Sequence, residues 1–325
     1  MALIRKIGII GLGHVGAHVA NSLLMEGIAD ELYLADINQK KLTSEVQDLS
    51  DALSFNPHNC KIVNCKDEYE KLAGCDVIVN AAGDVNASAV SRDGELFITT
   101  DIARTFIARV TDAGFKGIWV SIANPCDVVC TEICRLSGCD SKRVIGTGTA
   151  LDSARLRNAI SSKVGLDQHS INAYMMGEHG ASQFAVFSAA SFGGKPLEQL
   201  AKEQPDRFGF DQKEVEDLAR QGGYVTMAGK HCTEYAVANA AAMIVQAVVS
   251  NSHFVTACST MLQGEYGHSG HFASVPCVIG ADGIEEVINL ELNDREKKAL
   301  DASCEHITSN IARLGDWWNT ESRMK

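Results

Sequence analysis

The N-terminal stretch "KIGIIGLGHVG" constrains the fold more than any other part of the 325-residue chain. Its first five residues, 6–10, are mostly apolar, as in a buried strand, and they run directly into a turn with three glycines. The turn consists of Gly11, Gly13, His14, Val15 and Gly16, with Leu12 between the first two glycines. With this spacing, the first glycine permits a tight turn, the second leaves room for a pyrophosphate, and the third lets a helix pack on the strand. The stretch therefore predicts a dinucleotide site at a strand-to-helix turn.

An acidic residue supports the same prediction. The next apolar run, residues 31–36, ends at Asp36, about 20 residues beyond the glycines, where a carboxylate can accept hydrogen bonds from a ribose diol. An acid there repels the additional phosphate of NADP, so the predicted cofactor is NAD. Lys40 and Lys41 follow closely and would soften this preference if they faced the ribose.

The rest of the first half alternates apolar runs with segments of helical spacing. The predicted strands cover residues 6–10, 31–36, 61–64, 76–82, 117–123 and 143–148. This alternation predicts a mostly parallel sheet wrapped by helices.

After residue 150 the pattern changes. The later segments predict helices over 151–165 and 211–252, a hairpin over 273–292 that turns at 281–283, and a final helix over 293–314. We therefore expect two domains, a dinucleotide-binding domain over 1–148 and a mixed substrate domain over 149–325.

Composition excludes several classes of function. The net charge of −12 and the pI near 5.3 argue against nucleic acid as a partner, because such proteins carry a basic face. No apolar run is long enough for a membrane span, and the N-terminus lacks the apolar core of a signal peptide. We expect a cytoplasmic protein without a membrane partner.

The eleven cysteines are spread over the whole chain, so we expect reduced thiols rather than a disulfide framework. Cys126, Cys130 and Cys134 recur every four residues and would form one stripe on a helix. Neither a CxxC pair nor a histidine cluster accompanies them, which favours core packing over metal binding.

Two separated motifs carry groups suited to acid–base chemistry. "GEHG" places His179 between an acid and a glycine, and a histidine can gain or lose a proton near neutral pH. "LDSAR" places Asp152 and Arg155 one helical turn apart. An arginine fork matches a carboxylate, and an aspartate can orient an imidazole. Taken singly, the histidine could equally be structural, and the other two an ion pair within one helix.

Several motifs in one order are more specific than any of them alone. They are "GLGHVG", "AAG" at 81–83, "ANPCD" at 123–127, "IGTGTALDSAR" at 145–155, "GEHG" at 177–180 and "SVPCVIGADGI" at 274–284. With these motifs the chain resembles the lactate/malate dehydrogenase family over essentially its whole length. The resemblance implies an α/β fold, with a Rossmann-type doubly wound parallel sheet followed by a mixed α+β substrate domain. It also implies NAD as cofactor, a small 2-keto or 2-hydroxy acid as substrate, and a homodimer or homotetramer.

The resemblance also implies roles for individual residues. His179 would exchange the proton, with Asp152 as its partner, and Arg155 would hold the substrate carboxylate. Asn124 would help to position substrate and nicotinamide, Gly83 would contact the cofactor, and Arg92, on the family's mobile loop, would polarise the reacting carbonyl. The implied reaction is hydride transfer between an L-2-hydroxy acid and NAD, and it needs no metal.

Substrate preference is the least determined prediction. Asn86 stands where malate enzymes resemble one another in having arginine and lactate enzymes in having glutamine, and it lacks a positive charge for a second carboxylate. Thr233, in "GKHCTEYAVA", stands where lactate-like enzymes carry a threonine that faces the substrate. Similarity to L-2-hydroxyisocaproate dehydrogenase is also visible, so we expect a lactate-type or branched-chain 2-hydroxyacid dehydrogenase.

Two alternatives remain. One is malate dehydrogenase. The other is a non-catalytic NAD-binding sensor, which would keep the glycines and Asp36 but would not need the reactive residues together.

Overall fold

The computed structural model describes residues 4–84 and 92–315, and its side chains resume at residue 95 after the gap. The first half contains β1 (Lys6–Ile10), β2 (Glu31–Ala35), β3 (Lys61–Lys66), β4 (Val77–Asn80), β5 (Ile118–Ser121) and β6 (Val144–Gly146). All six predicted strands are thus present. The helices between them are α1 (His14–Met25), α2 (Gln39–Ala52), α4 (Arg92–Asp112) and α5 (Cys126–Ser137).

These six strands form a parallel sheet in the order β3-β2-β1-β4-β5-β6. The order reverses direction between β1 and β4, which confirms the predicted doubly wound arrangement. In such sheets a crevice opens beyond the carboxyl ends of the strands at the reversal point. Gly11 follows β1 and Ala81 follows β4, so the motifs "GLGHVG" and "AAG" both lie at this crevice.

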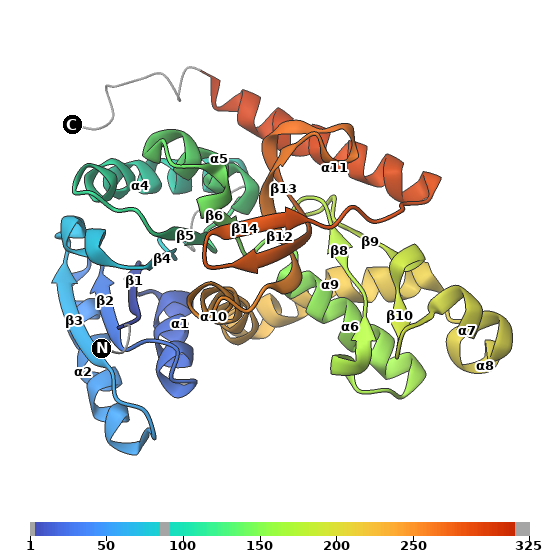
Figure 1. Cartoon of the computed structure of the whole chain (residues 1–325), viewed down its shortest axis with the longest axis horizontal. Coiled ribbons are helices and arrows are strands. Elements are labelled where there is room, and N and C mark those ends of the chain that lie inside the picture. The colour runs from blue at the N-terminus through green and yellow to red at the C-terminus, as the bar shows by residue number, and fades with distance from the viewer. Residues whose placement is uncertain (1–3, 85–91, 316–325) are drawn as a thin grey trace.

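Helices cover both faces of this sheet (Figure 1). Helices α1, α2 and α10 (Tyr235–Val249) lie on one face, and α4 and α5 lie on the other. A strand covered on both faces has no solvent side, so it is apolar throughout. In β1, Ile7, Ile9 and Ile10 are accordingly at most 1% exposed. On α5, Cys126 and Cys130 are buried, as the packing interpretation of the cysteine stripe predicts.

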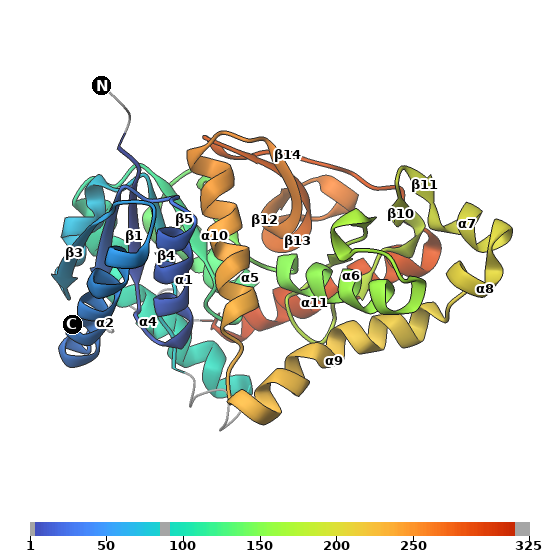
Figure 2. The ribbon, with the colours of Figure 1, turned by 90° about the horizontal axis from the view of Figure 1, so that it is seen from below.

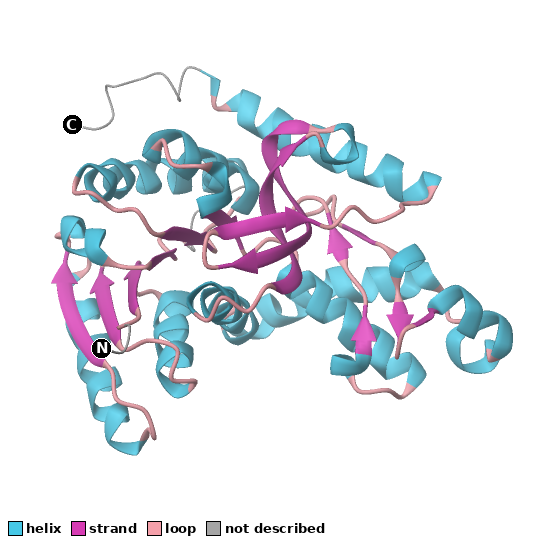
Figure 3. Ribbon diagram, viewed as in Figure 1, coloured by secondary structure: helices cyan, strands magenta, loops and turns pink. Residues whose placement is uncertain are grey.

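The sheet does not end with β6. Strand β12 (Phe254–Gln263) pairs antiparallel with β6, and β13 (Ser269–Gly280) and β14 (Gly283–Val287) extend the sheet to nine strands (Figure 3). The predicted hairpin is therefore confirmed as β13 and β14. Sequence analysis did not predict β12, because Thr256, Ser259 and Thr260 interrupt its apolar pattern although all three are buried. The division into domains at residue 148 stays a prediction, since one sheet crosses it.

The second half adds helices around small antiparallel ladders. The helices are α6 (Ala150–Val164), α7 (Leu197–Glu203), α8 (Pro205–Phe208), α9 (Gln212–Lys230) and α11 (Asp294–Arg313). The short strands are β7 (Ile171–Asn172), β8 (Met175–Met176), β9 (Phe184–Ala185), β10 (Ser191–Phe192) and β11 (Lys195–Pro196).

The stretch predicted as helical over 211–252 forms two helices. Helix α9 ends at Lys230, and the next residue, His231, has a left-handed φ of +64°. Helix α10 then runs along the sheet of the first half (Figure 2). No helix in the described ranges is long and apolar enough to cross a membrane.

Candidate active site

The three glycines after β1 differ in what surrounds them. Gly11 has a φ of +91°, and a Cβ there would lie 2.7 Å from the backbone of Ala82 after β4. A Cβ on Gly16 would collide with the carbonyl oxygen of Gly11, so the third glycine permits the close packing of α1 on β1. A Cβ on Gly13 would meet no atom within 4 Å. The second glycine therefore faces open space, as a pyrophosphate cradle requires.

That open space is part of a groove of about 470 Å³ at the carboxyl ends of β1, β2 and β4. Of the predicted cofactor residues, those that line it are Gly11, Gly13, His14, Val15, Asp36, Gly83 and Asn124. Gly16 is buried in the helix packing and does not line it. The groove thus brings together residues from three separate motifs.

Asp36 is held in place at this groove by the backbone. Its Oδ2 accepts a hydrogen bond from the amide of Leu12 at 2.6 Å, and its Oδ1 accepts one from the amide of Asn38 at 2.7 Å. Lys41 instead pairs with Glu45, and neither it nor Lys40 lines the groove. Among the described lining residues, Arg109 is the one arginine or lysine, and it already forms a two-point ion pair with Glu70. The groove is therefore acidic near the predicted ribose position.

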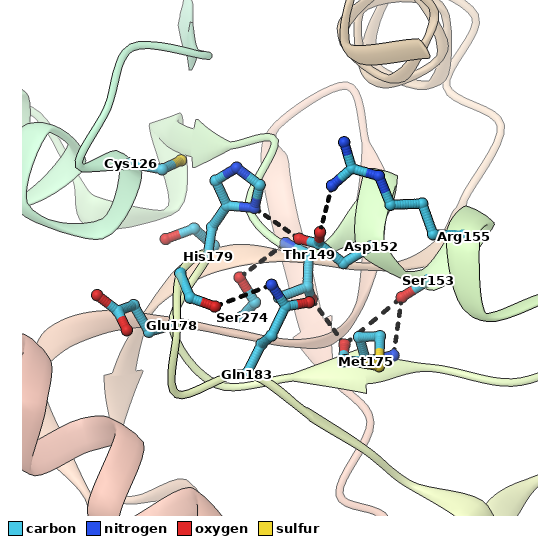
Figure 4. A network of polar contacts seen from close by, with 12 residues as sticks. Cys126, Thr149, Asp152, Ser153, Arg155, Met175, Glu178, His179, Gln183 and Ser274 are labelled. Atoms are coloured by element: carbon cyan, nitrogen blue, oxygen red, sulfur yellow. Dashed lines mark hydrogen bonds and ion pairs between the residues drawn. The ribbon is translucent and has the colours of Figure 1, made fainter. Parts of the chain in front are cut away.

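Asp152, His179 and Arg155 form a contiguous polar group (Figure 4). Asp152 is fully buried in the first turn of α6, and its Oδ2 lies 2.6 Å from Nδ1 of His179. Its other oxygen, Oδ1, accepts a hydrogen bond from Nη1 of Arg155 at 2.9 Å. One carboxylate therefore orients both the imidazole and the guanidinium.

This arrangement changes the protonation of His179. Burial alone would lower its pKa, but the negative charge and hydrogen bond of Asp152 outweigh that effect and raise the pKa to about 9. Burial would likewise raise the pKa of Asp152, yet the positive charges of His179 and Arg155 hold it below its ordinary value. At neutral pH the pair is thus an imidazolium beside a carboxylate.

Backbone contacts fix His179 relative to α6. Two hydroxyls at the start of α6 bind Met175 of β8: Oγ1 of Thr149, the residue before the helix, donates to its carbonyl at 2.6 Å, and Oγ of Ser153 accepts from its amide at 2.9 Å. Gly177 then takes a φ of +91°, and a Cβ there would collide with Ser303. The first glycine of "GEHG" is therefore required by the corner that presents His179.

A second carboxylate, which sequence analysis did not assign, binds the backbone amide of His179. The amide of His179 donates to Oδ2 of Asp127 at 3.1 Å, and Ser259 of β12 donates to Oδ1 at 2.5 Å. Burial raises the pKa of Asp127 to about 6, although both hydrogen bonds oppose this shift. The signal was present in the motif "ANPCD", but its partner Ser259 lies on the strand that was not predicted.

Asp152, Arg155 and His179 line a cavity of about 500 Å³. Asn124 and Glu95 line both this cavity and the cofactor groove, so the two spaces adjoin at Asn124. Helix α9 closes one side, where Gly222 and Gly223 lie against Arg155, and a Cβ on Gly222 would come within 3.1 Å of it. Further lining residues that sequence analysis missed are Leu96, Gln183, Arg220, Tyr224, Met227 and Arg313.

Three predicted residues are not brought to this cavity by the described structure. Asn86 lies outside the described residues. Arg92 begins α4, but its side chain lies outside the described part. Thr233 lies between α9 and α10, next to Cys232 of the groove, and lines neither space. Their roles stay predictions.

Comparison with known proteins identifies the class. Residues 5–146 match the NAD binding domain of lactate/malate dehydrogenase, and residues 149–316 match the alpha/beta C-terminal domain of the same family. The chain belongs to the lactate/malate dehydrogenase family, and it is an oxidoreductase of that family.

Individual relatives agree with this assignment. The chain is 40% identical to an L-lactate dehydrogenase of Fusobacterium nucleatum subsp. nucleatum over 92% of its own length and 94% of the relative's. It resembles the solved minor L-lactate dehydrogenase of Enterococcus mundtii with a TM-score of 0.91 and 30% identity, covering 96% and 98% of the two chains. It also resembles Cryptosporidium parvum malate dehydrogenase, with a TM-score of 0.87, 28% identity and coverage of 96% and 99%.

Proposed function

We propose that the protein is an NAD-dependent L-2-hydroxyacid dehydrogenase of the lactate or 2-hydroxyisocaproate type. The observation that carries this proposal is the contiguous group His179, Asp152 and Arg155 in a cavity that adjoins the dinucleotide groove at Asn124. A non-catalytic sensor would need the groove but not this group.

The groove residues fit NAD. Gly13 and the amino end of α1 would face the pyrophosphate, because that position is open and helix N-termini favour anions. Asp36 would accept hydrogen bonds from the ribose hydroxyls, and its negative charge disfavours the additional ribose phosphate of NADP. The cofactor, when bound, supplies the acceptor for the hydride that leaves C2 of the hydroxy acid.

The side chains supply the proton chemistry and the orientation. Nδ1 of His179 is bound to Asp152, so Nε2 is the nitrogen that would take the substrate hydroxyl proton during oxidation. In the reverse direction the imidazolium would donate this proton to the keto oxygen. Arg155 would bind the substrate carboxylate, and Asn124 would lie between substrate and cofactor. Arg92 would polarise the carbonyl from its position at the start of α4.

Malate dehydrogenase is the second candidate, for two reasons. The chain resembles a malate dehydrogenase structure, and Arg220 and Arg313 line the cavity as further guanidinium groups beside Arg155. Arg220 pairs with Glu216 at 2.6 Å and donates to the carbonyl of Gln183, but Glu216 also pairs with Arg295, so one carboxylate serves two guanidinium groups. The preference for a monocarboxylic substrate therefore rests on the uncharged Asn86.

Parallel assays distinguish these candidates. NADH absorbance is followed with pyruvate, 2-ketoisocaproate, phenylpyruvate and oxaloacetate, and each is repeated with NADPH. We expect rapid NADH oxidation with at least one monocarboxylic keto acid and slower oxidation with NADPH. Rapid oxidation with oxaloacetate alone would establish the malate alternative, and no oxidation with any of them would favour the sensor.

A further inference from the structure

The turn between β12 and β13 lies beside α11 (Figure 1). Three side chains that could act as metal ligands gather there, outside the cofactor groove and the substrate cavity. His268 precedes β13, His271 lies within it, and Cys304 lies on α11. One potential ligand atom from each of the three lies within 4.8 Å of the other two. None of the three lines the cofactor groove or the substrate cavity.

His271 has a buried nitrogen that lacks a partner. The residue is 5% exposed, and its Nδ1 lies 3.2 Å from the carbonyl oxygen of Ser269. A carbonyl only accepts, so Nδ1 carries the proton and Nε2 presents a lone pair. Among the described residues, Nε2 has no hydrogen-bond partner although it is buried. Buried polar atoms in proteins are nearly always paired, so this atom points to a ligand.

His268 is oriented in a similar way. Its Nε2 lies 2.8 Å from Oδ1 of Asp301, a carboxylate on α11. Nε2 is therefore the donor, and Nδ1 is left as the electron-pair donor. A histidine that donates one ring N–H to a carboxylate and keeps the other nitrogen free is the usual arrangement around a protein-bound metal. Each histidine thus keeps one ring nitrogen with a lone pair for a metal.

Cys304 supplies a sulfur to the same point. It is 1% exposed, and burial raises the pKa of its thiol to about 12, with the charges of Asp127 and Asp301 adding to the effect. A divalent cation reverses this preference, because it displaces the thiol proton and binds the thiolate. Two imidazoles and one thiolate form a donor set that suits zinc.

The separation of the ligand atoms is compatible with one ion. Zinc binds nitrogen at about 2.0–2.1 Å and sulfur at about 2.3 Å, which places tetrahedral ligand atoms roughly 3.5 Å apart. The ligand atoms, which lie within 4.8 Å of one another, must therefore approach by about 1.3 Å at most. The side chain of His268 is 21% exposed, so it has room for this adjustment and gives the ion access from solvent.

We propose that His268, His271 and Cys304 bind one Zn²⁺, which joins the start of β13 to α11. Asp301 orients His268 and is close enough in sequence to Cys304, one helical turn away, to lie beside the ion.

The ion would also stabilise the loop of the catalytic histidine. Ser303, next to Cys304, accepts a hydrogen bond from the amide of Glu178 at 2.6 Å and lies 3.0 Å from the hydroxyl of Ser182. The zinc is thus structural, and the chemistry of the proposed function proceeds without it.

Cobalt binding tests the proposal independently of turnover. The full-length protein is freed of metal with a chelator and titrated with Co²⁺, which gives a thiolate-to-cobalt absorption band when cysteine is a ligand. We expect this band to saturate at one equivalent per chain and to disappear in Cys304→Ser.

Cys232→Ser is the matched control. Cys232 belongs to a second cluster, with His14 and Glu234, at the cofactor groove. We expect the band to be retained in this variant. A band that disappears in Cys232→Ser but persists in Cys304→Ser, or no band in the parent protein, would overturn the proposal.

A surface variant guards against misfolding of Cys304→Ser. His268→Gln removes one ligand without entering the core, and we expect Zn²⁺ to raise the melting temperature of the parent protein but not of this variant. Asp301→Asn retains all three ligands, and we expect its Zn²⁺ affinity to fall roughly 10- to 100-fold. Equal Zn²⁺ affinity in the parent protein and His268→Gln would contradict the site.

Discussion

Oδ2 of Asp152 lies 2.6 Å from Nδ1 of His179, and the same carboxylate holds Arg155 through its other oxygen. Burial is the largest effect on the pKa of His179, and without the charge of Asp152 only the smaller effects of Cys126 and Asp127 would oppose it. The pair therefore determines both the direction in which Nε2 points and the pH at which His179 loses its proton.

The first prediction concerns pH. The pKa of His179 is raised to about 9, so the protonated form needed to reduce a keto acid dominates below that pH. We expect kcat/KM for keto acid reduction to fall as pH rises through about 9, and hydroxy acid oxidation to increase over the same range.

Asp152→Asn should move this transition to lower pH, because the lowering of the His179 pKa by burial is then opposed only by the smaller effects of Cys126 and Asp127. It should also reduce kcat/KM roughly 10²- to 10⁴-fold, the usual contribution of an oriented acid–base group. The matched control is Asp167→Asn, since Asp167 makes a similar 2.7 Å contact with His169 on the exposed surface. An unchanged transition in Asp152→Asn would show that Asp152 does not set the protonation of His179.

Arg155→Lys tests recognition of the substrate carboxylate. Lysine keeps the charge but loses the planar fork, so one charged hydrogen bond of roughly 1.5–3 kcal/mol is lost. We expect KM for the keto acid to rise about 10- to 100-fold with little change in NADH affinity. Arg157→Lys, on the same helix but away from the cavity, should leave KM unaltered. An equal loss of NADH affinity would argue for a general distortion of the site.

Asp36→Ser tests the cofactor assignment. Without the carboxylate, the ribose diol loses its acceptor and a ribose phosphate meets less negative charge. Fluorescence titration should show weaker NADH binding, by about 10-fold for one lost charged hydrogen bond, and a smaller difference between NADH and NADPH. Asp48→Ser, on the exposed face of α2, is the control. A variant that keeps the parent's preference for NADH would remove Asp36 from cofactor selection.

The glycines after β1 give a stability prediction. Gly16→Ala introduces a Cβ against the carbonyl oxygen of Gly11, and overpacking of this kind lowers the free energy of unfolding by about 1–3 kcal/mol. Gly13→Ala places its Cβ in open space, so we expect a change within about 0.5 kcal/mol but weaker NADH binding. Urea unfolding without cofactor separates the two effects. If Gly13→Ala were as unstable as Gly16→Ala, the assignment of Gly13 to the open cofactor groove and of Gly16 to helix packing would be refuted.

The sequence predicts those parts of the structure that depend on contacts between residues close together in the chain. The strand and turn at residues 6–16 are a local pattern, in which a short apolar run and the spacing of the glycines indicate the backbone geometry directly. Strand β12 was not predicted, because Ser259 and its polar neighbours are buried by residues that are distant in sequence. Asp127 and Ser259, 132 positions apart, form a contact that no local pattern contains.

The site was predicted unevenly for the same reason. Spacing alone placed Asp152 and Arg155 on one helix face, but only the family resemblance joined them to His179. Arg220 and Met227 of α9 were missed, because they reach the cavity only through the packing of α9 beside α6. The "GG" within α9 was a usable signal, since glycines inside a helix often mark a close approach, here to Arg155.

The most direct test of the account is to measure His179→Asn for both NADH binding and keto acid reduction. His169→Asn serves as a surface control, because His169 is exposed and pairs with Asp167 away from the cavity. We predict that His179→Asn binds NADH with nearly the parent's affinity but loses at least about 10²-fold in kcat, as expected when the proton donor is removed. Reduction at a rate close to that of the parent protein would contradict the central claim that His179 exchanges the substrate proton.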